Sequence, residues 1–165
     1  MQILASAIRT VLLAAIIAMG VGSAAVAGPY EDAFAAYERQ DYATAMRLWQ
    51  SLADQGDAKA QYNLGNMYAD GEGVAENDAE AVKWYRKVAD QGDARAQHNL
   101  GVMYAEGEGV PEDDAQAYKW WNLAAAQGIE EAKGNKAIVE KTMTREQIAE
   151  AQRLSTEWKP IGERD

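Results

Sequence analysis

The sequence contains no cysteine and only one phenylalanine. The lack of cysteine excludes disulfide bonds, thiolate metal sites, cysteine nucleophiles and a lipid-bearing cysteine near the N-terminus. The residues of catalytic triads are scarce as well. Beyond the N-terminal presegment the chain has one histidine, His98, and two serines, Ser51 and Ser155. Both serines fall in predicted helices rather than in a strained elbow, and no sequence neighbour orients His98 as a base.

Alanine supplies most of the apolar residues, and tyrosine and tryptophan supply nearly all the aromatic bulk. This composition suits closely packed helices better than a β-sandwich. The formal net charge is −10. An acidic surface repels nucleic acid and anionic lipid, and it favours a neutral or basic partner. The alternative is that the charge only keeps the protein soluble.

Residues 1–27 read as a secretory signal peptide. Arg9 provides the positive region, residues 11–19 the apolar core, and Ala25-Val26-Ala27 a small-x-small cleavage site. We therefore expect cleavage between Ala27 and Gly28, leaving a periplasmic or secreted chain with 15 basic and 26 acidic side chains, net charge −11. The alternative is an uncleaved membrane anchor, for which the apolar run is short because a bilayer span needs about 20 residues.

A repeat with an interval of 36 residues organises the rest of the chain. Ala53–Val74 and Ala89–Val110 are identical at 18 of 22 positions, and the register continues through Trp84 and Trp120. A third, partial copy starts at Gln127 and then decays. Self-similarity at this period is the signature of stacked supersecondary units.

Each unit is predicted to contain two helices. The first begins at Asp57 or Asp93 as N-cap and carries apolar residues at spacings of three and four. Mid-helix Gly65 and Gly101 suggest that a neighbouring helix crosses closely there. After a glycine-containing loop, the second helix begins near Asn77 or Asp113. The tryptophans Trp49, Trp84, Trp120 and Trp121 are expected to fill the space between helices, with carbohydrate stacking by an exposed tryptophan as the alternative.

A divergent helix pair, 31–40 and 42–55, opens the array, and a helix starting at Thr144 and stopping before Pro160 closes it. The predicted fold is an all-α solenoid of antiparallel helix pairs with seven or eight helices and a right-handed superhelical twist. The expected repeat domain is 28–160, divided at about 30–56, 57–92, 93–128, 129–142 (partial) and 143–159 (capping helix), with a tail at 161–165.

These residues resemble Sel-one-like repeats, which are similar to tetratricopeptide repeats. The resemblance rests on Ala-x-Ala-Gln-x-Asn-Leu-Gly-x-Met-Tyr-x-x-Gly-x-Gly-Val at 58–74 and 94–110, followed by Asp-x-x-x-Ala-x-x-Trp-x-x-x-Ala-x-x-Gly at 78–92 and 114–128. It implies an α-solenoid whose first helices line a concave face, and an adaptor or scaffold role. Some cysteine-rich relatives are linked to β-lactams, but this chain lacks their cysteines.

The two full copies differ at four positions that fall on one stripe of the first helix, within an arc of about 80°. The candidate ligand-binding residues are therefore Lys59, Tyr62, Asn66 and Asp70, with Arg95, His98, Val102 and Glu106. A mixed polar, aromatic and charged stripe suits an extended peptide. The alternatives are an undedicated surface and binding through the other face or the loops.

The loop carboxylates do not have the spacing of a calcium-binding loop, and we expect no metal or cofactor; the residues concerned are Asp70, Glu72, Glu76 and Asp78. The function expected is a protein-interaction module for a protein or peptide partner, without catalysis and without a stable membrane anchor after cleavage. A hydrolase of cell-wall or β-lactam substrates and a purely structural subunit of an envelope complex are the alternatives.

Overall fold

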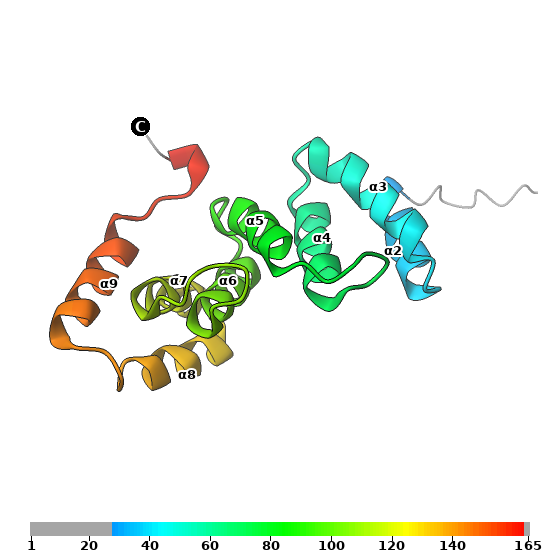
Figure 1. The fold of residues 1–165 in the computed structure, drawn as a ribbon. Coiled ribbons are helices and arrows are strands. Elements are labelled where there is room, and N and C mark those ends of the chain that lie inside the picture. Colours follow the sequence, from blue (N-terminus) through cyan, green and yellow to red (C-terminus); the bar gives the residue numbers. More distant parts are fainter. Residues whose placement is uncertain (1–27, 164–165) are drawn as a thin grey trace, which may run out of the picture.

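The computed structural model describes residues 28–163, and the predicted signal peptide, 1–27, lies outside them. The described chain forms eight α-helices and a short 3-10 turn (Figure 1). They are α2 (Pro29–Glu38), α3 (Tyr42–Asp54), α4 (Ala58–Asp70), α5 (Asp78–Ala89), α6 (Ala94–Glu106), α7 (Asp114–Ala126), α8 (Glu130–Val139), α9 (Arg145–Glu157) and η1 (Ile161–Glu163). Successive helices pack as antiparallel pairs, which confirms the predicted all-α solenoid.

Polar caps start the helices where the sequence predicts them. The carboxylate of Asp57 accepts a hydrogen bond from the backbone N–H of Ala60 at 2.8 Å, and Asp93 caps α6 in the same way. Asn77 and Asp113 cap the second helices through the same kind of bond. These caps satisfy N–H groups that have no partner inside the helix. The opening helix begins at Pro29, two residues before the predicted Glu31, because proline is pre-shaped for the first helical position.

Two mid-helix glycines allow the helices of each unit to approach closely. A Cβ atom on Gly65 would lie 2.7 Å from the ring of Tyr85, and one on Gly101 would lie 2.6 Å from the ring of Trp121. Normal carbon–carbon contacts are about 3.5–4.0 Å. The predicted close crossing is therefore present, and it is an aromatic ring of the second helix that occupies the space.

Buried glutamines connect consecutive units. Gln61 and Gln97 each donate from their amide to a backbone carbonyl eight residues earlier, that of Ala53 and Ala89 respectively. Each also accepts a hydrogen bond from the glutamine 30 residues later, Gln91 and Gln127 in turn. Buried amides need such partners, because an unpaired polar group in the core is destabilising.

The core consists of three successive apolar clusters rather than one centre. Trp49, Trp84, Trp120 and Trp121 are each at most 9% exposed, which confirms their predicted packing role. This layered core is what a stack of repeats requires, because each unit buries its apolar face against its neighbours.

The C-terminal end folds back on the array. Thr144 and Gln147 form the predicted reciprocal capping box of α9. Beyond α9, Trp158 packs edge-on against Trp120 with ring centroids 6.2 Å apart. Within the expected tail, the described residues 161–163 form η1, and the backbone N–H of Ile161 donates to the carbonyl of Asp90 at 2.9 Å. Ile161 therefore contacts the turn between α5 and α6.

Candidate binding face on the first helices

The predicted stripe lies outside the buried core along the described first helices. Lys59, Asp70, Arg95 and Glu106 are exposed, whereas Tyr62, Asn66, His98 and Val102 are half-buried. We call the surface formed by these residues, together with Tyr30, Phe34, Glu131 and Ile138 of the flanking helices, the first-helix face.

Cation–aromatic pairs recur along this face. The Lys59 ammonium lies 5.7 Å from the ring centroid of Tyr30, whose hydroxyl accepts a hydrogen bond from Asn63 at 3.0 Å. One unit later, the guanidinium of Arg95 lies 4.7 Å from the ring of Tyr62. The Tyr62 hydroxyl accepts from Asn99 at 3.3 Å. The stripe therefore also joins consecutive first helices, because each cation and asparagine holds the aromatic residue of the preceding unit.

The next unit reverses the charge of this arrangement. His98 takes the place of Tyr62, and Glu131 takes the place of Arg95. Burial lowers the pKa of His98, and the negative charge of Glu131 opposes that shift. The Nδ1 atom of His98 is buried without a hydrogen-bond partner in the described residues.

Three equivalent hollows open on the first-helix face, one at each junction between consecutive first helices. We call them the repeat hollows: the first, second and third measure about 180, 150 and 230 Å³. They share an aromatic floor from the second helices, namely Trp49, Tyr85 and Trp121. They also share an asparagine wall, made by Asn63, Asn99 and Asn135.

Residues of the predicted stripe complete the hollows. The lining of the first includes Asn66, and that of the second includes Val102. Asn66 accepts a hydrogen bond from the Tyr85 hydroxyl at 2.8 Å, so this side chain also fixes the floor of the second hollow. Apolar residues line the first and third hollows: Phe34 is 48% exposed and Ile138 is 64% exposed.

A carboxylate lines the second hollow and another lines the third, whereas a residue of the first is bonded to a carboxylate outside its lining. Glu108 lines the second hollow and Asp114 the third. In the first, the hydroxyl of Tyr37 donates to Glu72 at 2.5 Å, and this bond raises the pKa of Tyr37 to about 12. Burial, helped by the nearby carboxylates, raises the pKa of Glu108.

Among the loop carboxylates, Glu72 has hydrogen-bond partners within the protein. Glu72 is bonded by two tyrosine hydroxyls, those of Tyr37 and Tyr42. Burial raises the pKa of Asp70, and the charge of Glu72 adds to that shift. Within residues 28–163, no three carboxylate, histidine or cysteine side chains converge as a metal site would require.

The two serines considered as possible nucleophiles lie on different helices. Ser51 is exposed on α3, and the buried Ser155 donates its hydroxyl to the carbonyl of Ala151 within α9. The hydroxyl of Ser155 is thus bonded to the preceding turn of its own helix.

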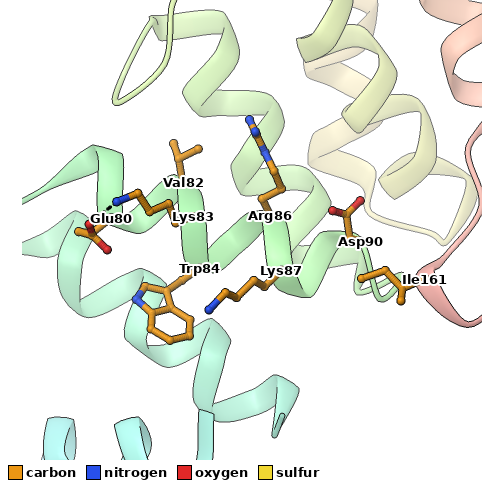
Figure 2. Close-up of a pocket in the computed structure, with 8 residues that line it drawn as sticks. All are labelled: Glu80, Val82, Lys83, Trp84, Arg86, Lys87, Asp90 and Ile161. Atoms are coloured by element: carbon orange, nitrogen blue, oxygen red, sulfur yellow. Dashed lines mark hydrogen bonds and ion pairs between the residues drawn. The ribbon is translucent and has the colours of Figure 1, made fainter. Parts of the chain in front are cut away.

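A shallow groove of about 390 Å³ lies on the outer side of α5 and has a different character (Figure 2). Lys87 lies 4.0 Å from the ring centroid of Trp84, and Lys83 pairs with Glu80. Arg86 points to the other side of the helix, and Ile161 closes the groove beside Asp90. With Arg86 counted, the lining holds three cations and two carboxylates, whereas no lysine or arginine lines the repeat hollows.

Comparison with known proteins identifies the repeat. The Sel1 repeat profile matches residues 33–57, 58–93 and 94–129. The chain belongs to the Sel1 repeat family. The match includes the opening pair, so the divergent segment before residue 57 is a Sel1 repeat too. No curated protein sequence gives a significant match.

Solved structures of Sel1 repeat proteins share this fold. One is a protective antigen present in uropathogenic Escherichia coli strains, displaying an SLR fold; it has a TM-score of 0.74 and 30% identity over 79% of this chain and 29% of that chain. Another is a Sel1 repeat protein from Oxalobacter formigenes, with a TM-score of 0.64 and 30% identity over 79% of this chain and 56% of that chain. This chain therefore spans less than two thirds of either structure.

The comparison of the two full Sel1 repeats in the sequence did not identify every residue of the first-helix face. Tyr30 and Phe34 precede Tyr62 and Asn66 by 32 residues rather than 36, because the turn after α2 is short. Ile138 lies in the partial copy. Extending the register of Val102 by one further interval of 36 reaches it.

Proposed function

We propose that the protein is a binding module that holds a protein or peptide partner along the first-helix face, without catalysis. The observation that carries this proposal is the recurrence of a hollow with the same floor and wall at each junction between first helices. A periodic row of pockets suits an extended ligand, whose main chain repeats at regular intervals. Exposed Phe34 and Ile138 provide apolar contacts at both ends of the row.

A photo-crosslinking experiment tests this location. A photoreactive phenylalanine analogue replaces Phe34 in one variant and Ile138 in another, because both side chains reach solvent. The control carries the analogue at Lys83, which is exposed on the outer side of α5. We expect the same partner to be crosslinked from positions 34 and 138 and not from position 83. Equal crosslinking from all three positions would contradict the proposal.

We also propose that the protein is exported and acts in the periplasm or outside the cell. The signal-peptide pattern of residues 1–27 supports this proposal. No helix within residues 28–163 is long and apolar enough to cross a bilayer. N-terminal sequencing of the protein purified from its host should begin at Gly28. An intact N-terminus in the membrane fraction would show an anchored protein instead.

A further inference from the structure

We propose that each repeat hollow receives a long cationic side chain, lysine or arginine, from an extended basic segment of the partner. This inference rests on the proposed function and names the chemistry of the ligand. It follows from the aromatic floor and the amide wall that the three hollows share, and from the carboxylate that lines the second and the third.

The aromatic floor suits the stem and the head of such a side chain. A lysine or arginine buries its methylene groups against apolar surface, and its charged head is attracted to an aromatic face. This chain already uses that contact elsewhere: Lys87 lies 4.0 Å from the ring of Trp84, and Lys119 lies 4.0 Å from the ring of Trp120. The hollows present the adjacent residues of the same helices, Tyr85 and Trp121.

The carboxylates of the second and third hollows supply the matching charge. Glu108 lines the second hollow, and the negative charges of Glu106, Asp78 and Glu76 act on it. These like charges lie in or directly beside two successive loops, and they repel one another. A partner cation placed at the mouth of the hollow relieves that repulsion, whereas an acidic side chain adds to it.

The spacing of the hollows sets the spacing of the cations. The hydrogen bond from Asn99 to Tyr62 joins consecutive first helices, which places them on the order of 10 Å apart, and an extended chain advances about 3.3 Å per residue. A cation at about every third residue therefore reaches successive hollows. A run of adjacent lysines has the same charge but cannot place its side chains in the same way.

Binding of a synthetic peptide tests the inference by fluorescence anisotropy. The probe is a labelled dodecapeptide made of four Lys-Ser-Ala units, compared with a peptide of the same composition whose lysines are adjacent and with a glutamine version. We expect the spaced peptide to bind about fivefold or more tightly than the clustered one, and the glutamine version to bind weakly. Equal affinity of the spaced and clustered peptides would show attraction by net charge alone and would overturn the inference.

Variants of the second hollow locate the binding. Glu108→Gln should weaken the spaced peptide about threefold, as expected for a partly exposed charge. The matched control is Glu146→Gln on exposed α9, which removes the same charge and should leave the affinity unchanged. An equal loss in both variants would contradict a role for the hollow.

Filling the hollow without changing charge gives the second line of evidence. Val102→Trp and Ala69→Leu add bulk from opposite walls of the second hollow, and each should weaken binding while the helical circular dichroism is retained. If one variant misfolds, the other decides. If the native partner still crosslinks from Phe34 and Ile138 but no basic peptide binds, the partner chemistry is wrong and the proposed function stands. Failure of both experiments refutes both.

Discussion

Replacing Gly101 by alanine tests the close crossing of α6 and α7. The new Cβ atom would lie 2.6 Å from Cδ1 of Trp121. That ring has little freedom to move, because its Nε1 donates to the carbonyl of His98 at 3.2 Å and the residue is 5% exposed. Overpacking of this kind costs about 1–3 kcal/mol, whereas the higher helix propensity of alanine returns about 0.5–1 kcal/mol. Because the ring is held in place, we expect the upper part of the overpacking range, about 2–3 kcal/mol, and therefore a net destabilisation of about 1–2.5 kcal/mol.

Gly134 provides the matched control, because it is also helical but has no atom within 4 Å of the position that a Cβ would occupy. Gly134→Ala should therefore stabilise the protein by about 0.5–1 kcal/mol through helix propensity alone. Urea unfolding followed by far-ultraviolet circular dichroism and by tryptophan fluorescence measures both changes. With a slope of about 1–3 kcal/mol per molar urea, Gly101→Ala should lower the midpoint by several tenths molar or more.

The outcome that would refute the argument is a stability of Gly101→Ala equal to or above that of the wild type, with Gly134→Ala behaving as expected. Propensity would then outweigh packing, and the ring of Trp121 would not limit the approach of the helices. A change in tryptophan fluorescence without loss of stability would show that the ring moves aside at little cost.

Two further predictions concern buried polar groups. Gln97→Leu should destabilise the protein by about 1–3 kcal/mol in urea unfolding, because the carbonyl of Ala89 loses its buried donor, whereas Gln55→Leu at an exposed site should change stability by less than about 0.5 kcal/mol. Because burial lowers the pKa of His98, the unfolded state binds its proton more readily; stability from this group is therefore complete above pH 6.5 and is lost as the pH falls through the lowered folded pKa. Unfolding free energies between pH 7 and pH 5 should fall less in His98→Gln than in the wild type, and identical slopes would contradict this assignment.

The elements of the fold follow from local signals in the sequence. Asp57 and Asp93 start helices because their carboxylates accept hydrogen bonds from free backbone N–H groups of the first turn. This preference allows the start of each helix to be predicted from the residue type alone. Gly65 and Gly101 predicted that a neighbouring helix crosses closely at these positions, because glycine in the middle of a helix is otherwise unfavourable. The strict interval of 36 residues then fixes which residues of one unit correspond to those of the next.

The hollows could not be predicted in the same way. Each is built from several elements, such as Ala69 of α4, Tyr85 of α5 and Asn99 of α6. Sequence periodicity shows that these positions recur, but not that they surround an open space. The role of Asn66 illustrates the difference: it was predicted as a ligand contact, and in the structure it also accepts the hydroxyl hydrogen of Tyr85.

The contact between the C-terminal segment and the turn after α5 changes how the array should come apart. In an ideal repeat stack each unit touches only its neighbours, and the ends fray independently. Here Trp158 rests on Trp120, and Ile161 is hydrogen-bonded to Asp90. Unfolding that starts at the C-terminal end therefore breaks the contacts of this segment with two earlier units. Unfolding of the last helix and loosening of the middle of the molecule should then occur together.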